Sequence, residues 1–152
     1  YFIITFISIL FFTGKPAFAQ IQMEEEISGK AAYIQGIEAF ENEEFDTAKE
    51  LLLKASRSLT NAPGVSYALA DTYLALDDLP NAALYGKQAV DSDPEDKWFR
   101  LKLAQIYRSA GRNQATLDEL NALLDYHPND FNALYMLADT YIDYGELKPH
   151  NF

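Results

Sequence analysis

The chain has 152 residues and carries 12 Lys and Arg against 23 Asp and Glu, for a formal net charge of -11. Nucleic acid and anionic membrane surfaces are therefore unexpected ligands, because both attract basic surfaces and no cluster of Lys or Arg occurs here. The chain has no cysteine, which excludes disulfides, thiolate metal sites and a cysteine nucleophile.

Residues 1–19 have the pattern of a secretory signal peptide. Phe2 to Phe12 is apolar apart from two hydroxyl residues, and Ala17-Phe18-Ala19 forms a small-x-small cleavage site before Gln20. An uncleaved anchor is the alternative, although a spanning helix needs roughly 20 apolar residues. We expect an exported protein, periplasmic or secreted, that is cleaved after Ala19 and does not insert into the membrane afterwards.

Past a lead-in at 20–28, apolar residues recur every three or four positions, which is the spacing of amphipathic helices. The pattern predicts helices at 27–40, 45–59 and 65–76, then a helix with Pro80 in its first turn, then helices at 97–110, 114–124 and 131–144. Gly111 and Gly145 are predicted to end the helices before them, because glycine readily takes the conformation that closes a helix.

The predicted helices repeat with a fixed period. Leu69-Ala70 returns as Leu103-Ala104, and Tyr73 and Pro94 return as Tyr107 and Pro128, in each case 34 residues later. A period of this length is typical of stacked repeats, and it is stronger evidence than the helix assignments taken one by one. The period therefore predicts pairs of helices stacked in chain order.

These residues resemble the tetratricopeptide repeat family, whose 34-residue pattern has Leu, a small residue and Tyr in the first helix and closes with Pro. The small residues of this pattern are Gly36, Ala70, Ala104 and Ala138, and its tyrosines are Tyr73, Tyr107 and Tyr141. The first repeat departs from the pattern at Gln35, Ala39 and Thr60. The resemblance implies repeats at 29–62, 63–96 and 97–130, and the first helix of a fourth at 131–152.

The resemblance also implies the fold. We expect an all-α solenoid in which antiparallel helix pairs stack into a right-handed superhelix. The small residues would let paired helices cross closely, and the three tyrosines would be buried between repeats. Gly86, in the middle of a second helix, would make room for a bulky neighbour such as Tyr85 or a residue of the third repeat; a functional kink is the alternative.

In such folds the concave face, made by the first helix of each pair, carries the binding site. A groove for a peptide or a partner's helix is therefore expected there, and we expect a protein-protein interaction scaffold. The groove residues that the resemblance implies are Lys30, Tyr33, Ile37, Tyr67, Asp71, Leu74, Trp98, Leu101, Gln105, Arg108, Asn132, Tyr135 and Asp139. The alternative is a docking or sensory arm of a longer envelope protein, either peptidoglycan-binding or signalling. Self-association through an uncapped C-terminal end also remains open.

One ligand known in the family is not expected. Chaperone-binding members hold a C-terminal carboxylate with a clamp of Lys, Asn and Arg, and the matching positions here are Tyr33, Ile37, Ala68, Trp98 and Lys102. Only Lys102 keeps the charge of the clamp. The resemblance therefore does not extend to binding of these chaperone tails.

No enzyme, cofactor or metal site is expected. The acidic stretch from Asp91 to Asp96 alternates carboxylates as a calcium loop does, but Asp96 and Lys102 stand where that loop needs Gly and Glu. An acidic turn is the simpler interpretation. His127 and His150 have no nucleophile or ligand partners at suitable spacing.

Overall fold

The protein, described here by a computed structural model, has its structure defined over residues 17–147, and side chains over 19–143. This part consists of seven helices and contains no strand. Their bounds are α1 Ala17–Glu41, α2 Phe45–Ser58, α3 Pro63–Ala75, α4 Leu79–Ser92, α5 Lys97–Ser109, α6 Asn113–Tyr126 and α7 Phe131–Leu147. The all-α prediction is confirmed, and most of the predicted signal peptide, residues 1–16, lies outside the described residues.

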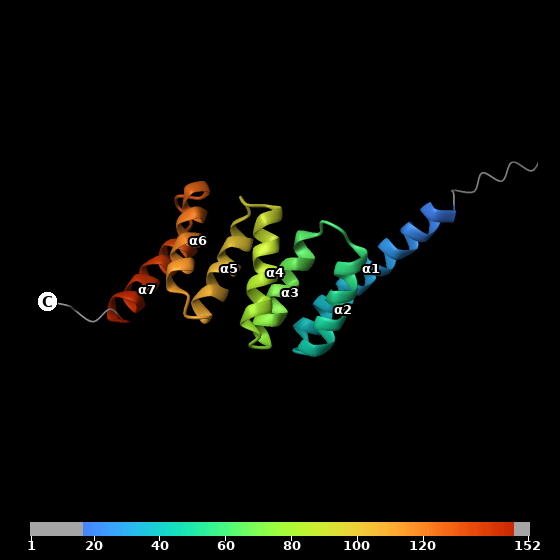
Figure 1. Cartoon of the computed structure of the whole chain (residues 1–152), viewed down its shortest axis with the longest axis horizontal. Coiled ribbons are helices and arrows are strands. Elements are labelled where there is room, and N and C mark those ends of the chain that lie inside the picture. The colour runs from blue at the N-terminus through green and yellow to red at the C-terminus, as the bar shows by residue number, and fades with distance from the viewer. Residues whose placement is uncertain (1–16, 148–152) are drawn as a thin grey trace, which may run out of the picture.

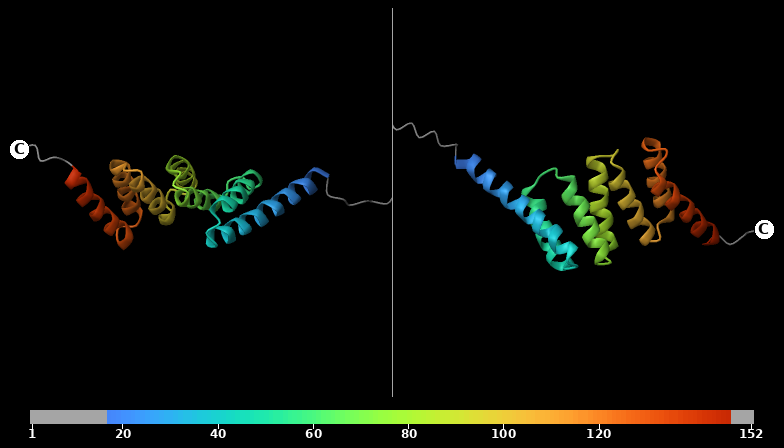
Figure 2. Two further views of the ribbon diagram at one scale, coloured as in Figure 1. Left: turned by 90° about the horizontal axis from the view of Figure 1, so that it is seen from below. Right: turned by 180° about the vertical axis from the view of Figure 1, so that it is seen from behind.

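The helices form a single stack in chain order. α1 packs on α2, α3 on α4 and α5 on α6, and α7 follows as the first helix of a fourth pair (Figure 1). Both further views show the same order, with α1 and α7 at opposite ends (Figure 2). Among the described helices, every substantial contact joins helices that are neighbours or next-but-one in the chain.

Small residues stand where packed helices approach closely, both within pairs and between them. Ala70 and Ala104 are fully buried. A Cβ added at Gly36 would lie 2.8 Å from Leu52 Cγ, and one added at Gly86 would lie 3.2 Å from both Leu103 Cδ1 and Ile106 Cδ1. The predicted role of Gly86 is confirmed, and the bulky neighbours belong to the third repeat.

The turn inside each pair has one conformation. Glu43, Asp77 and Gly111, spaced 34 residues apart, have φ of 62°, 58° and 65°. In each turn the amide of the following residue bonds a carbonyl five residues back, at 2.8 to 2.9 Å. The turn therefore imposes the left-handed conformation even on residues other than glycine.

Gly145 does not end its helix, so that prediction is wrong. It stands 34 residues after Gly111, but α7 continues through it to Leu147. Glycine permits the left-handed conformation without requiring it. The chain reverses direction at positions 43, 77 and 111, and after these turns α2, α4 and α6 pack against the helices before them.

The three repeat tyrosines are not equally buried. Tyr73 is partly buried and its ring stacks on that of Tyr85, with centroids 5.5 Å apart. Tyr107 is also partly buried, and the guanidinium of Arg112 lies 4.6 Å from its ring centre. Tyr141 is 53% exposed, which contradicts its predicted burial. No second helix covers α7 within the described residues, and so nothing there encloses Tyr141.

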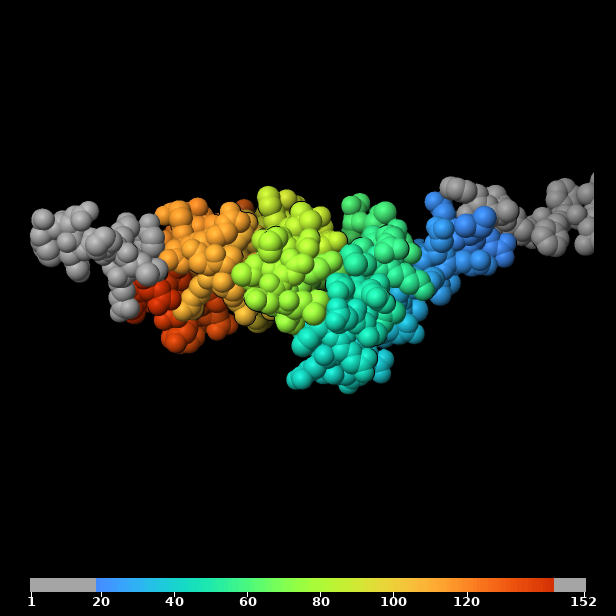
Figure 3. Space-filling view, turned by 60° about the horizontal axis from the view of Figure 1, so that its bottom comes forward, coloured from blue at the N-terminus to red at the C-terminus, as the bar shows by residue number. Residues whose placement is uncertain are grey.

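α1 begins at Ala17, ten residues before the apolar period that predicted it. Gly29 lies against Ser58, the last residue of α2, so the part of α1 before Gly29 extends past its partner. Figure 3 shows this part, in blue, projecting from the stack. Ile21 and Ile27 on it are exposed. None of the described helices is both long and apolar enough to cross a membrane.

Candidate functional site

The first helices of three successive repeats line an open groove of about 340 Å³. Tyr67 comes from α3, and the other lining residues come from α5 and α7. We call it the α3–α5–α7 groove, and its lining residues are Tyr67, Trp98, Leu101, Lys102, Gln105, Arg108, Asn132, Tyr135 and Met136.

Helix periodicity and two capping aspartates position this lining. On α5 the lining residues recur at three and four positions from Trp98 to Arg108, so they share one face of the helix. Asp96 begins α5 by accepting hydrogen bonds from the backbone N–H of Trp98 at 2.8 Å and of Phe99 at 3.0 Å. Asp130 begins α7 by accepting from Ala133 at 3.1 Å. Both caps satisfy amides that the helix itself leaves unbonded.

Three aromatic rings stand along the groove. Trp98 is 54% exposed and Tyr135 is 66% exposed, whereas Tyr67 is half-buried with its ring 5.6 Å from that of Phe99. Burial raises the pKa of the Tyr67 phenol above its ordinary value. Exposed rings beside apolar side chains are the usual anchors of a protein-binding surface.

The charged side chains of the groove bridge adjacent repeats. Lys102 Nζ donates to Asp71 Oδ1 at 2.7 Å, which joins α5 to α3. Arg108 pairs with Asp139 and, at 3.0 Å, with Asp143, which joins α5 to α7. Desolvation works against the charge of Arg108, but these carboxylates raise its pKa overall. Asp71 and Asp139 are not among the lining residues, but each bonds one of them, Lys102 or Arg108.

Four predicted groove residues lie elsewhere. Lys30 pairs with Glu26 at 2.6 Å and lines a separate hollow near the end of α2. Tyr33 and Ile37 pack on the core of the first two repeats, and Leu74 packs on the core between the second and third. The side chains of Tyr33, Ile37 and Leu74 are thus used in packing, whereas Lys30 stays exposed.

Sequence reasoning missed two lining residues, Lys102 and Met136. Each stands four residues after a predicted one, namely Trp98 and Asn132, so helical spacing could have found both. The bond of Lys102 to Asp71 shows that it is already engaged within the array.

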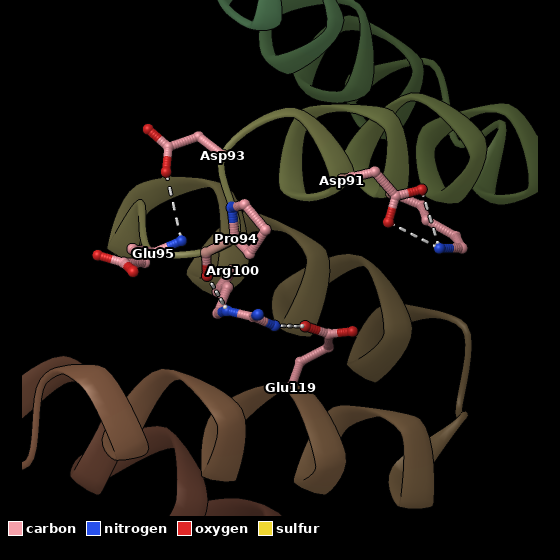
Figure 4. Close-up of polar contacts among 7 residues, drawn as sticks. Asp91, Asp93, Pro94, Glu95, Arg100 and Glu119 are labelled. Carbon is pink, nitrogen blue, oxygen red and sulfur yellow. Dashed lines mark hydrogen bonds and ion pairs between the residues drawn. The ribbon is translucent and has the colours of Figure 1, made fainter.

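The acidic stretch from Asp91 to Asp96, which begins in the last turn of α4, uses its carboxylates separately (Figure 4). Asp91 accepts from Lys87 at 2.9 Å, Asp93 accepts from the backbone N–H of Glu95 at 3.3 Å, and Asp96 caps α5. Arg100 donates to the carbonyl of Pro94 at 2.6 Å and to Glu119 at 2.8 Å. Over the described residues, no three His, Asp or Glu side chains are placed to hold a metal ion together.

A family model described as "Tetratricopeptide repeat" matches residues 33–97 and 101–148. Cellulose synthase operon protein C of Pseudomonas fluorescens (strain SBW25) is 38% identical over 58 residues, which are 38% of this chain and only 4% of that protein's length.

Two solved structures show how general the fold is. The first TPR of Spaghetti (RPAP3), bound to the HSP90 peptide SRMEEVD, is 15% identical with a TM-score of 0.73 and covers 79% of this chain and 95% of that one. YrrB, "a TPR protein with an unusual peptide-binding site", is 21% identical with a TM-score of 0.71 and covers 80% of this chain and 62% of that one. At these identities the likeness shows the fold alone.

Proposed function

Because the chain belongs to the tetratricopeptide repeat family, we propose that it is a protein-interaction scaffold that binds a peptide or a partner's helix in the α3–α5–α7 groove. The observation that carries this proposal is the groove itself. Seven of its nine lining residues were expected there from the repeat register, and two of them present exposed aromatic rings beside Leu101 and Met136. Binding to proteins is what such a rigid, partly apolar groove can do.

Peptide binding by proteins of the same fold supports the proposal. The Spaghetti domain is bound to an HSP90 peptide, and the second TPR domain of human RPAP3 is in complex with an HSP70 peptide. We do not extend those ligands to this chain, because Lys102 alone keeps the charge of the clamp and Asp71 already holds it. What these structures support is peptide binding by a protein of this fold.

Selection from a random peptide library tests this function. Dodecamers displayed on phage are selected on the protein and counter-screened on a variant carrying Trp98→Ala and Tyr135→Ala. Both residues are exposed, so the variant should keep its fold, which circular dichroism checks. We expect selected peptides to bind the variant at least tenfold more weakly, because buried aromatic anchors dominate such interfaces. Equal binding to both proteins would reject the groove as the site.

We further propose that the protein is exported, on the strength of the apolar run and Ala-x-Ala pattern at its N-terminus. Cleavage after Ala19 would leave Gln20 near the start of α1. N-terminal sequencing of the protein recovered from the envelope or medium of a bacterial host tests this. A chain that still begins ahead of Gln20 in the envelope fraction would favour the uncleaved anchor.

A second candidate is a docking arm within a longer envelope protein, either peptidoglycan-binding or signalling. It is favoured by the match to a small part of the much longer Cellulose synthase operon protein C. An antibody raised against residues 29–143 and used on cells that make the natural protein decides the question. A band far above 17.2 kDa would favour the arm, and a band at or below that mass would favour the independent scaffold.

A further inference from the structure

Carboxylates outnumber cations beside the α3–α5–α7 groove. Lys102 is held by Asp71, and Arg108 is held by both Asp139 and Asp143, so three carboxylates face two cations. Asp71 accepts from Lys102 through Oδ1, and Asp143 accepts from Arg108 through Oδ2. The excess of one carboxylate gives this side of the groove a net negative charge, which favours an incoming cation over an incoming carboxylate.

The array itself shows how it binds a cation at this face. Tyr67 and Asp71 lie four residues apart on α3, and together they hold one ammonium group. Lys102 Nζ lies 5.6 Å from the centre of the Tyr67 ring and 2.7 Å from Asp71 Oδ1. Lys97 is held in the same way at the next junction, 4.7 Å from the centre of the Trp98 ring and 3.1 Å from Asp130. A ring face and a carboxylate both attract the cation that they share.

Tyr135 and Asp139 repeat the first of these pairs. Each stands 68 residues, or two periods, after its counterpart Tyr67 or Asp71, and both lie on one face of α7. Arg108 bonds Asp139, but the described structure places no cation over the ring of Tyr135. This ring is 66% exposed and lines the groove.

We propose that the α3–α5–α7 groove selects basic segments, and that the Tyr135–Asp139 pair binds a Lys or Arg side chain of the bound peptide as Tyr67–Asp71 binds Lys102. This rests on the proposed function, since it names the chemistry of the ligand at the same site. Gln105 and Asn132, both exposed in the groove, supply neutral amides for the peptide backbone. The acidic balance of the whole chain adds long-range attraction for such a ligand.

Three matched peptides test the proposal. They share the order Gly-Leu-X-Phe-X-Leu-Gly with blocked ends, where X is Arg, Gln or Glu. Trp98, the single tryptophan of the chain, reports binding through its fluorescence. We expect the Arg peptide to bind about fivefold or more tightly than the Gln peptide, the Glu peptide to bind most weakly, and the preference to shrink as salt rises.

Two variants locate the effect. Asp139→Asn and Tyr135→Leu should each weaken the Arg peptide about fivefold more than they weaken the Gln peptide. Asp118→Asn is the matched control, because it removes one carboxylate from α6 away from the groove; it should change neither peptide by more than about twofold. Circular dichroism confirms that each variant is folded.

The outcomes separate this inference from the function on which it rests. Equal binding of the Arg and Gln peptides, tighter binding of the Glu peptide, or equal losses from Asp118→Asn and Asp139→Asn would overturn the inference while the groove remains a binding site. The library provides the other arm. Groove-dependent peptides without a Lys or Arg excess contradict only the inference, and an absence of any groove-dependent peptide rejects the proposed function as well.

Discussion

The first and second junctions between repeats occupy equivalent positions and are built differently. At 59–62 the sequence is Leu-Thr-Asn-Ala, and Leu59 and Ala62 pack on a core that contains Leu52, Val65 and Leu69. At 93–96 the sequence is Asp-Pro-Glu-Asp, and its polar groups bond one another, the start of α5 and Arg100. The first junction is thus stabilised by apolar packing and the second by hydrogen bonds.

The stabilities of the two junctions should therefore respond differently to pH and salt. Apolar packing is insensitive to moderate changes of pH and salt, whereas bonds to carboxylates weaken when these groups are protonated. The third junction resembles the second, because His127 Nε2 donates to the carbonyl of Glu95 at 2.8 Å and Asp130 caps α7. Substitutions at matched positions can test whether the contrast is real.

The largest effect is expected from Leu69→Ala, which removes a fully buried side chain from the core of the first junction. We expect a loss of about 2 to 5 kcal/mol in the free energy of unfolding, because the deletion leaves a cavity. Urea unfolding at low and high salt measures it, and the loss should be the same in both. Leu84→Ala, 53% exposed on α4, should cost less than about 0.5 kcal/mol. Equal losses would contradict the assigned core.

Asp96→Ala breaks the second junction at its cap. The backbone N–H groups of Trp98 and Phe99 lose their acceptor, so we expect a loss of about 1 kcal/mol. Thermal unfolding followed by circular dichroism checks this. Asp93→Ala is the comparison, since its bond to Glu95 is longer and exposed, and it should cost less. A larger loss from Asp93→Ala would show that the cap is not what stabilises this junction.

Ala62→Asp transfers the cap to the first junction. No side chain caps α3, and Gly64 and Val65 stand where Trp98 and Phe99 stand on α5. The amide of Val65 already bonds the carbonyl of residue 62 at 2.9 Å, so the new carboxylate gains chiefly the amide of Gly64, and we expect a gain of about 0.5 to 1 kcal/mol in stability. The same unfolding measurement applies. A loss of stability instead would mean that the packing of Ala62 cannot be exchanged for hydrogen bonds.

The smallest effect is expected at Asp130, through its charge. The backbone N–H of Ala133 and, beyond it, the ammonium of Lys97 lower the pKa of Asp130. Its ionised form therefore stabilises the fold above the unfolded pKa of about 3.9, and this stability is lost as the pH falls through the lower folded pKa.

Asp130→Asn keeps a capping oxygen but removes the charge, so its cost should be below about 1 kcal/mol at neutral pH and should vanish in acid. Unfolding of both proteins between pH 2 and pH 7 measures the difference. A cost that stays constant over this range would exclude the ionised form as its source.

Much of the fold was predictable because it follows from local pattern repeated at a fixed spacing. The close packing at Ala70 and Ala104 follows from the family resemblance, and the reversal at Gly111 follows from the conformational freedom of glycine. Tyr141 was not predictable in this way. Its local sequence nearly copies that around Tyr73, and the two differ only in what covers them. The start of α1 at Ala17 was not predicted, because its first residues overlap the predicted cleavage site and precede the apolar period.

The groove residues that follow from their position on one helix face were predicted, whereas the ion pairs between helices were not. Trp98 and Tyr135 follow from the face of the helix on which they stand. The pair of Lys102 with Asp71 joins residues 31 apart on different helices, and sequence spacing does not show which side chains meet across a packed interface. The pair of Lys30 with Glu26 is an ordinary one-turn spacing, and it could have warned that Lys30 is engaged within its own helix.

The restriction of contacts to nearby helices couples the groove to the end of the stack. α7 is held only by α5 and α6 among the described helices, yet it supplies Asn132, Tyr135 and Met136 to the groove. α7 can therefore detach while the first two repeats stay folded, and in that state the site is dismantled. A peptide that binds the complete groove stabilises the attached state by mass action. Peptide binding at the site and attachment of α7 to the stack are thus thermodynamically coupled.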